Sequence, residues 1–212
     1  MMNLQAKSQK KKSKEKTHFG SPNKASNLFF NNDFNSQKFE QNSYYYCGNN
    51  KGIEFNNCFF RNIIISYRNY AYFIYTYDTS LTITNSNFSY ITYYENLIYF
   101  QTQLTTFYTS QFTMKSNIIS YCYSSSTSEA TIIHSDCYTT DFQYNTVYFD
   151  PSITIGQAFY LYYHTGTTFI GNKVYNSFLA RGGGLYFEEK GSKSELKMSE
   201  CVFSNCRGEN GA

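Results

Sequence analysis

The sequence predicts an all-β protein built as a β-solenoid. Its 212 residues include 23 Tyr and 20 Phe, no Trp and only 2 Pro, and 16% of the residues are charged. So many aromatic side chains on a background of Asn, Ser and Thr are typical of strands and turns, and they exclude an intrinsically disordered chain. Two short motifs also alternate with a period of 24–28 residues, which is typical of solenoid coils. A β-sandwich or barrel would suit this composition but would not require two alternating motifs.

Residues 1–42 are predicted to be a disordered basic arm. The first sixteen residues hold six Lys and one Glu, whereas the rest of the chain holds twelve basic and fourteen acidic residues. The basic character therefore belongs to the arm, and the folded body is not expected to bind nucleic acid. A solvated tail is the first interpretation, with a nuclear-targeting, nucleic-acid or anionic-lipid patch as the alternative.

The folded domain is predicted to span residues 43–212. The first motif places alternating apolar residues before an aromatic residue and Asn, in copies at 53–62, 81–91, 105–112 and 196–206, with looser ones at 131–145 and 167–172. The second motif is a short aromatic run, found at 70–74, 96–100, 156–160 and 182–187. No single unit can bury its apolar side alone. About six stacked coils are therefore expected to form the sheets and the core together.

The repeats assign structural roles to particular residues. One aromatic residue per coil is expected to stack inside the solenoid as a single ladder: Phe60, Phe88, Phe112, Phe169 and Phe203. Coil corners that need a left-handed or Cβ-free backbone are assigned to Asn62, Asn145, Asn172, Asn205, Gly182, Gly183 and Gly184. Asn tolerates the left-handed region and bonds to nearby backbone, and Gly has no Cβ to clash.

These motifs resemble the repeats of chlamydial polymorphic outer membrane proteins and of their relatives in trichomonad-type protists. The family repeats read GGA(I/L) and FxxN, and they are matched here by 182–187 with 201–206 and by 59–62, 142–145 and 169–172. Gly184 replaces the family's Ala, and Asn205 follows Phe203 at the second position instead of the third. The resemblance implies a right-handed parallel β-helix of the pectin-lyase-like type.

The same resemblance leads us to expect that the domain is truncated at its C-terminal end. Residues 205–212 stop where the family would open another coil, and an unfinished coil leaves an exposed edge that can self-associate. No apolar run is long enough for a transmembrane segment, and no signal peptide is visible. Localisation is therefore left open: cell surface or secreted if a signal peptide precedes this sequence, and cytoplasmic otherwise.

No constellation of residues predicts catalysis, a metal or a cofactor. Asp136 and Asp141 fall in one coil, but turn capping explains them better than a carboxylate pair does. Glu188 and Glu189 are assigned to a solvated loop, and the three histidines, at 18, 134 and 164, have no metal-ligand spacing.

The six Cys, at 47, 58, 122, 137, 201 and 206, are interpreted first as buried free thiols. A Cys201–Cys206 disulfide is the alternative in a secreted protein. Asn87 begins a glycosylation sequon.

We therefore expect a non-enzymatic, adhesin-like surface module with a face rich in Tyr, Ser, Thr and Asn. Its expected partners are host or cell-surface proteins or glycans. The alternatives are a pectin-lyase-like polysaccharide lyase or glycoside hydrolase, and an intracellular scaffold with a basic tail.

Overall fold

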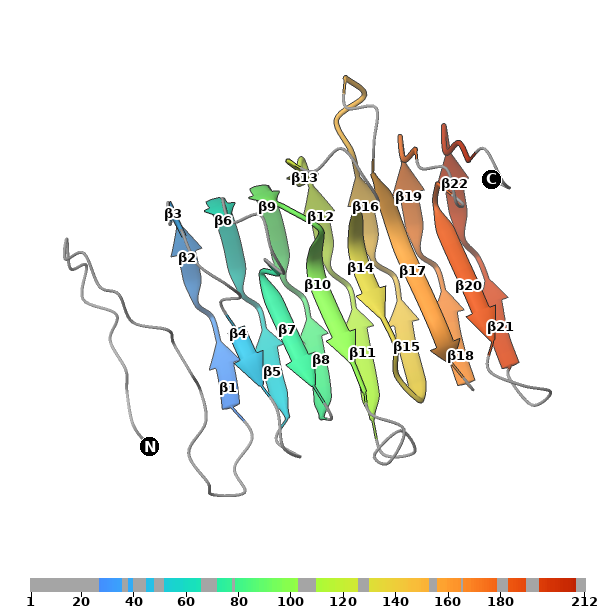
Figure 1. The fold of residues 1–212 in the computed structure, drawn as a ribbon, viewed down its shortest axis with the longest axis horizontal. Coiled ribbons are helices and arrows are strands. Elements are labelled where there is room, and N and C mark those ends of the chain that lie inside the picture. Colours follow the sequence, from blue (N-terminus) through green and yellow to red (C-terminus); the bar gives the residue numbers. More distant parts are fainter. Residues whose placement is uncertain are drawn as a thin grey trace.

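The computed structural model describes residues 27–35, 38–39, 45–47, 52–65, 72–77, 79–102, 110–125, 130–152, 156–164, 166–178, 183–189 and 195–208. Within these ranges every named element is a β-strand, and the strands pair in parallel to form three long sheets (Figure 1). The chain visits the sheets in turn and returns one level further along the stack, so the predicted all-β parallel solenoid is confirmed. The stack has about five turns. Its right-handed winding and the count of six coils stay predictions.

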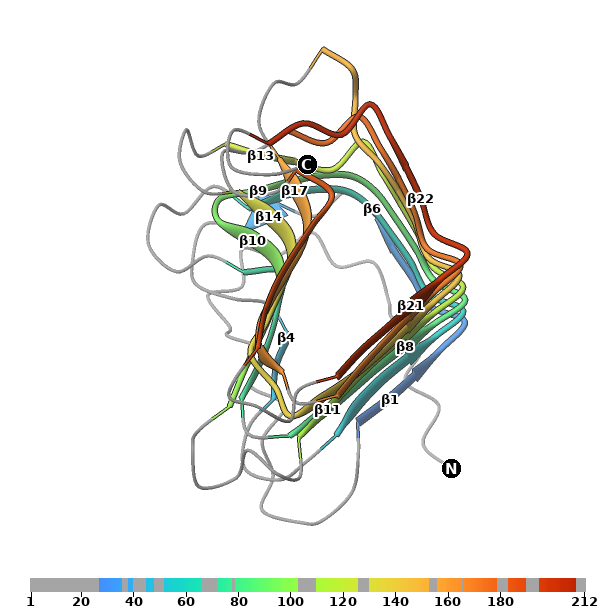
Figure 2. The same cartoon turned by 90° about the vertical axis from the view of Figure 1, so that its right-hand side faces the viewer.

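Three sheets enclose one core, as Figure 2 shows in a view along the stack. Sheet A contains β4 (Tyr45–Cys47), β7 (Ile74–Tyr77), β10 (Asn96–Gln101), β14 (Thr131–Ser135), β17 (Gln157–His164) and β20 (Leu185–Glu189). Sheet B contains β1 (Asn27–Phe30), β5 (Ile53–Asn56), β8 (Ser80–Thr84), β11 (Gln111–Lys115), β15 (Thr139–Gln143), β18 (Gly166–Ile170) and β21 (Glu195–Ser199). Sheet C contains β2 (Asp33–Asn35), β6 (Phe59–Ile65), β9 (Asn87–Tyr93), β12 (Ile118–Ser120), β16 (Thr146–Tyr148), β19 (Lys173–Tyr175) and β22 (Val202–Ser204). Two short strands of sheet C, β3 (Lys38–Phe39) and β13 (Tyr123–Ser124), pair beside this path with β6 and β9.

The core consists of inward columns in which one side chain per coil lies above its equivalent in the next. In sheet C the central column is Phe34, Phe60, Phe88, Ile119, Val147, Val174 and Phe203. In sheet B a corresponding column is Phe29, Phe55, Ile83, Met114, Phe142, Phe169 and Met198. In each coil the apolar residue from sheet B and the one from sheet C lie at the same height in the stack. Their side chains meet in the core and hold the two sheets together.

The predicted phenylalanines are mostly inside, but they do not form a single ladder. Phe60, Phe88, Phe112 and Phe169 are fully buried, and the rings of Phe60 and Phe88 stack with centroids 4.6 Å apart. Phe112 and Phe169 belong to sheet B, at two different inward positions, so the prediction of one shared position is wrong. Repeat units that look alike in sequence fall on different sheets because each coil carries more than one apolar–x–apolar segment.

The corner between sheets B and C places one residue per coil in the left-handed region. These residues are Asn31, Asn57, Asn85, Ser116, Tyr144, Gly171 and Glu200, with φ between 50° and 63°. The residue that follows each of them points inward. Asn117, Asn145 and Asn172 are fully buried there and form an amide ladder. The Nδ2 of Asn145 donates to Asn172 Oδ1 (2.9 Å) and to the carbonyl of Met114 (2.9 Å), so the buried amide is satisfied.

A second corner bends the chain within sheet C. Its left-handed residues are Asn62, Tyr90, Tyr121, Asn176 and Asn205, with φ between 53° and 60°. The four predicted corner asparagines therefore divide between two corners. Asn62 and Asn205 have positive φ at the second, whereas Asn145 and Asn172 lie inside the first, one residue after the left-handed position.

Gly183 and Gly184 lie where the backbone approaches the next coil. A Cβ on Gly183 would collide with the carbonyl of Arg207, and one on Gly184 would collide with the ring of Phe203. The absence of a side chain is therefore required for close packing at this level. Gly182 lies outside the described residues.

The predicted boundary at residue 42 is wrong, because β1, β2 and β3 belong to the first coil. Phe29 stacks on Phe55 with centroids 4.9 Å apart, and Phe34 stacks on Phe60 at 4.8 Å. The sparse aromatic residues of this segment are enough to complete two inward columns, although its overall composition is polar. Residues 1–26 lie outside the described residues, and the prediction of a disordered arm is not addressed there.

Candidate functional site

The outer face of sheet B is polar in its central strands, whereas Leu28 and Phe30 of β1 are exposed on it. In β5, β8, β11 and β15 the outward side chains are Glu54, Asn56, Ser80, Thr82, Thr84, Gln111, Thr113, Lys115, Thr139, Asp141 and Gln143. Lys115 Nζ lies 2.6 Å from Asp141 Oδ2, and Gln143 Nε2 donates to Asp141 Oδ1 (2.6 Å). This face has the character of an ordinary solvated surface, with its charges paired to each other.

The outer face of sheet A carries a column of aromatic rings. One ring per coil comes from Tyr75, Tyr99, His134, Tyr160 and Tyr186. The centroids of Tyr160 and Tyr186 are 4.7 Å apart with the rings nearly parallel. The hydroxyl of Tyr75 donates to Gln101 Oε1 (2.9 Å), and that of Tyr186 donates to Glu188 Oε2 (2.7 Å). The rings are half-buried, so they are packed side chains with polar tips.

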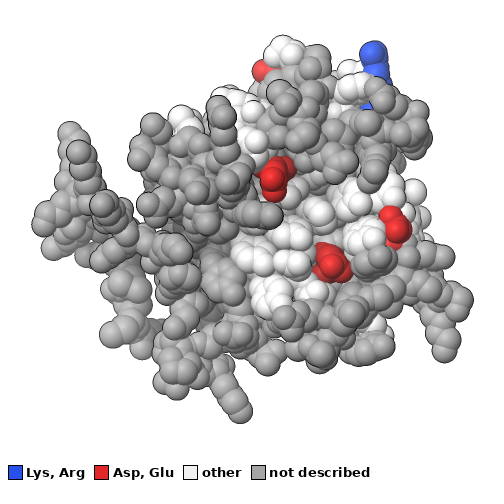
Figure 3. All heavy atoms as spheres, in the orientation of Figure 1, with Lys and Arg blue, Asp and Glu red and all other residues white. Residues whose placement is uncertain are grey.

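Burial controls the ionisation of this column. Burial, assisted by the charges of Asp136 and Glu95, raises the pKa of Tyr99 to about 12. Burial also lowers the pKa of His134 to about 4, so this imidazole is neutral at neutral pH. Figures 1 and 2 together place sheet A toward the viewer of Figure 3, where acidic side chains stand apart on the described surface. A neutral His134 among tyrosines does not provide an acid–base pair near pH 7.

The outer face of sheet C carries exposed apolar side chains between polar ones such as Asn87, Ser89 and Thr92. Its exposed large side chains, which we call the sheet C patch, are Phe59, Ile64, Tyr90, Ile118, Tyr121 and Tyr123. Tyr90 is 58% exposed and Ile118 is 50% exposed, although both come from the best-packed part of the stack. Neighbouring apolar side chains left in water on one face of a folded domain mark interaction surfaces.

Tyrosines form the ridge of the sheet C patch. The rings of Tyr90 and Tyr121 are parallel within 6°, with centroids 5.2 Å apart. Tyr148 and Tyr175 continue the row, with centroid distances of 5.5 Å from Tyr121 to Tyr148 and 6.1 Å from Tyr148 to Tyr175. The four rings thus form a row along the solenoid, with one tyrosine from each coil in contact with the next.

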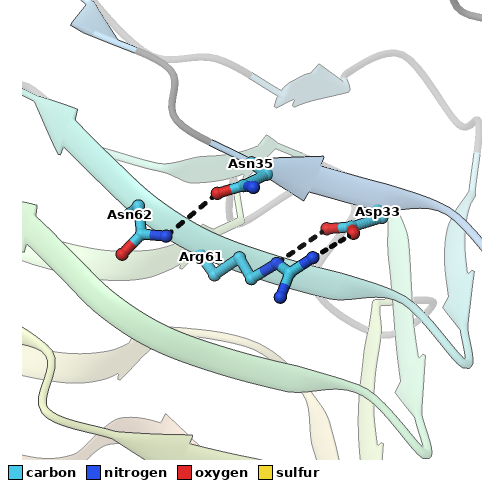
Figure 4. Close-up of polar contacts among 4 residues, drawn as sticks. All are labelled: Asp33, Asn35, Arg61 and Asn62. Carbon is cyan, nitrogen blue, oxygen red and sulfur yellow. Dashed lines mark hydrogen bonds and ion pairs between the residues drawn. The ribbon is translucent and has the colours of Figure 1, made fainter.

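Polar and charged side chains lie at both ends of the sheet C patch. At the first coil, Arg61 Nη2 lies 2.5 Å from Asp33 Oδ2, and Asn62 Nδ2 donates to Asn35 Oδ1 (2.9 Å), as Figure 4 shows. At the other end Lys173 of β19 is exposed. The strands between these ends, β9, β12, β13 and β16, carry no charged residue. An apolar centre with a charged periphery is the arrangement found in protein interfaces.

The carboxylates considered in the sequence analysis lie on different sheets and contact different side chains. Asp141 is paired with Lys115 on sheet B, while Asp136 raises the pKa of Tyr99 on sheet A. Glu188 accepts from Tyr186 at the end of β20 and is not in a free loop. His18 and the side chains of Glu189 and His164 lie outside what the structure describes.

The five cysteines with described side chains form no disulfide. Cys58, Cys122 and Cys137 are buried thiols that form no disulfide, as predicted, and burial raises the pKa of Cys122 and of Cys137 to about 12. Cys201 and Cys206 are also free, so the structure does not contain the alternative disulfide. The thiol of Cys201 instead lies 3.3 Å from the carbonyl of Phe169. These sulfurs fill corner positions of the core. The side chain of Cys47 lies outside what the structure describes.

Other candidate features give no site. Among the described residues, no group of three or more His, Cys, Asp or Glu is placed to hold a metal ion. The described part of the chain has no helix of the length and apolarity that crossing a membrane requires. Asn87, the predicted glycosylation residue, begins β9 on the outer side of sheet C, and its Oδ1 is buried.

The sheet C patch was not predicted, because the second corner interrupts the alternation of inward and outward side chains along the strand. Counting from inward Phe88, strict alternation would put Tyr90 inside and Ile91 outside. The left-handed backbone at Tyr90 (φ 54°) reverses this, so that Tyr90 is exposed and Ile91 is buried. A tyrosine between Ser and Ile gives no sign of a left-handed position, since Asn and Gly are its usual markers.

Comparison with protein-family models, with curated proteins and with solved structures finds no match to this chain.

Proposed function

We propose that the protein is a non-enzymatic, adhesin-like binding module whose sheet C patch contacts another protein. The observation that carries this proposal is the group of exposed large apolar side chains along β6, β9, β12 and β13 of sheet C, where β9, β12 and β13 contain no charged residue. Tyr is enriched at protein interfaces because it combines an apolar ring with a polar tip, and charged residues are depleted at interface centres.

The ring geometry favours a protein partner over a glycan. A sugar packs its C–H groups on the face of an aromatic ring, where the ring's negative charge lies. Tyr90 and Tyr121 stack one face of each ring on the other, which leaves less ring face open for a sugar at this pair. Their edges, on the same face as Ile118, suit an apolar protein surface with a few hydrogen-bond acceptors.

The resemblance of the repeats to polymorphic outer membrane proteins supplies the proposed setting, which is the surface of a cell. A rigid solenoid suits this role because its coils hold contact residues at fixed spacing, and little side-chain freedom is lost on binding. Parallel backbone pairing on both sides of β9 and β12 provides that rigidity for the central tyrosines.

The test is a binding screen of the purified chain against immobilised extracellular-matrix proteins and a glycan array. A double variant, Ile118→Lys with Tyr121→Lys, places charges at the centre of the sheet C patch. Its matched control, Thr82→Lys with Thr113→Lys, places the same charges on the outer face of sheet B. We expect at least one protein to bind, with affinity reduced about tenfold or more by the first variant and little by the control. Binding to glycans alone, or equal losses in both variants, would refute the proposal.

A further inference from the structure

Tyr90 and Tyr121 are two exposed phenols that the fold holds in ring contact. Their rings are parallel within 6°, with centroids 5.2 Å apart, and the residues are 58% and 37% exposed. Ser89 and Ser120, the residues before them, are direct partners in the parallel pairing of β9 and β12. The two tyrosines therefore occupy equivalent corner positions of successive coils, and strand pairing keeps their rings together.

The backbone at this corner is fixed, so the contact does not depend on the rings alone. Both residues have a left-handed φ, 54° at Tyr90 and 53° at Tyr121, and the N–H of Tyr121 donates to the carbonyl of Tyr148 in the next coil (3.1 Å). The side chains directly after them, Ile91 and Cys122, are buried in the core. Each phenol is thus attached to an anchored backbone while part of its ring is in water, where a reagent can reach it.

Two phenols in contact can be joined by oxidation. A one-electron oxidant removes one electron from each phenol, each hydroxyl loses its proton, and the two phenoxyl radicals form a C–C bond between ring carbons ortho to the oxygens. Those carbons then release their hydrogens as protons and the oxygens take up protons, so the net change is the loss of two hydrogen atoms. With hydrogen peroxide as the final oxidant, one peroxide is reduced to two water molecules. Holding the rings in contact removes the need for a diffusional encounter.

The aromatic column of sheet A contains a closer pair that is less suited to this reaction. The rings of Tyr160 and Tyr186 are parallel within 7°, with centroids 4.7 Å apart, but both residues are half-buried. The hydroxyl of Tyr186 is also engaged, since it donates to Glu188 Oε2 (2.7 Å). Carbon–carbon coupling requires the rings to turn from a stack to an edge-to-edge position. Packed side chains resist this turn, whereas the exposed rings of Tyr90 and Tyr121 are free to make it.

We propose that Tyr90 and Tyr121 form an oxidative cross-linking site, which a peroxidase or another one-electron oxidant converts to an intramolecular dityrosine. The new bond ties two successive coils together at the surface of sheet C, in a chain whose described cysteines form no disulfide. A covalent link between coils restricts the unfolded chain, as a disulfide does. The site does not depend on the partner proposed for the sheet C patch.

The experiment is oxidation of the purified chain, at low concentration, with a plant peroxidase and hydrogen peroxide. The monomer is isolated on a denaturing gel, and its dityrosine fluorescence is measured. Trypsin cleaves after Lys115 and so separates the two tyrosines. We expect peptides 69–115 and 116–173 to be recovered as one species, lighter by two hydrogen atoms than the two together. Fragmentation in the mass spectrometer should place the link on Tyr90 and Tyr121.

Single substitutions by Phe test the assignment. Tyr90→Phe and Tyr121→Phe keep the ring and remove the hydroxyl, so each should remove most of the intramolecular dityrosine. Tyr144→Phe is the matched control, because Tyr144 is 55% exposed at a left-handed corner position and contacts no other ring among the described residues. Its yield should equal that of the original chain, and thermal melting establishes that each variant is folded.

Three outcomes would overturn the proposal. The first is dityrosine that forms only between molecules, with none in the monomer. The second is an intramolecular link that survives both Tyr90→Phe and Tyr121→Phe, which would assign it to other tyrosines such as those of sheet A. The third is an equal loss in Tyr144→Phe, which would mean that exposure alone, and not ring contact, decides the yield.

Discussion

The outer faces of sheets B and C are formed by consecutive segments of the same coils, yet they are opposite in character. In β8 and β11 the outward side chains are Ser, Thr, Gln and Lys, whereas Tyr90 of β9, Ile118 of β12 and Tyr121, which follows β12, are exposed on sheet C. Inside, the two sheets are alike, with columns of Phe, Ile, Met and Leu.

This difference separates what the fold requires from what it does not. A solenoid needs apolar inward columns and left-handed corners. The central strands of sheet B show that its outward positions can be polar. The apolar residues outside sheet C are therefore unnecessary for folding. Under the proposed function, these exposed residues contact a partner. Four predictions test this contrast, beginning with the largest effect.

The first prediction compares the two sides of β9. Phe88→Ala should lower the free energy of unfolding by about 3–5 kcal/mol, because it opens a cavity in the core beside the stacked ring of Phe60. Tyr90→Ala, two residues away on the outer side, should have a much smaller effect, since the side chain is already exposed. Urea unfolding of both variants gives the comparison. Similar losses would mean that the outer tyrosine is a structural residue.

The second prediction concerns the aromatic face of sheet A, which is packed while the sheet C patch is open. His134 has a pKa of about 4 in the folded chain and 6.5 in the unfolded chain, because burial disfavours its charged form. The unfolded state therefore binds the extra proton first, and stability should fall by about 3 kcal/mol as pH drops from 6.5 to 4.

The variant that tests this is His134→Tyr, which copies the residue found at the same position in neighbouring coils. Urea unfolding at pH 7 and pH 4 should show a smaller acid loss in the variant, while the carboxylates contribute equally to both proteins. Identical pH dependence would show that His134 is solvated like an exposed side chain.

The third prediction addresses the corner that joins sheets B and C. Asn145→Leu should lower the free energy of unfolding by about 2–3 kcal/mol, because it removes the acceptor of the buried backbone N–H of Asn117 and the donor to the carbonyl of Met114. Asn145→Ser should lose less, since Ser86 holds the equivalent position and accepts from the N–H of Cys58 (3.0 Å). Equal losses in thermal or urea unfolding would mean that side-chain volume, and not hydrogen bonding, is what the corner needs.

The fourth prediction has the smallest effect on stability. Ile118→Thr and Tyr121→Asn replace outward residues by those found in other coils, Thr146 and Asn62. Each should change the free energy of unfolding by about 0.5 kcal/mol or less, because the sites are exposed and Asn favours a left-handed backbone. A loss above 2 kcal/mol in either variant would assign the patch to folding instead of binding.

The sequence was sufficient for the architecture because its signal is repeated in every coil. A period near 27 residues and buried phenylalanines follow from stacking, and they appear many times over. The column assignments were not accessible, since Phe60 and Phe112 have similar neighbours in sequence but lie on different sheets. The first coil was missed because Phe29 and Phe34 stand alone in a polar segment, and their packing partners are 26 residues further along the chain.

The candidate site was less predictable than the fold, for a local reason. A single left-handed residue reverses which side of the strand is buried, and Tyr90 and Tyr121 give no sequence signal for that backbone. The predicted Tyr-, Ser-, Thr- and Asn-rich face was therefore a statement about composition, without a location.

The most direct test of the account is hydroxyl-radical footprinting of the chain with and without a protein identified in the binding screen. This method reads the solvent exposure of individual aromatic side chains. The account predicts that oxidation of Tyr90, Tyr121 and Tyr123 falls when the partner binds, while oxidation of Tyr75 and Tyr186 on sheet A is unchanged. Protection of the sheet A tyrosines with no change at Tyr90 and Tyr121 would contradict it.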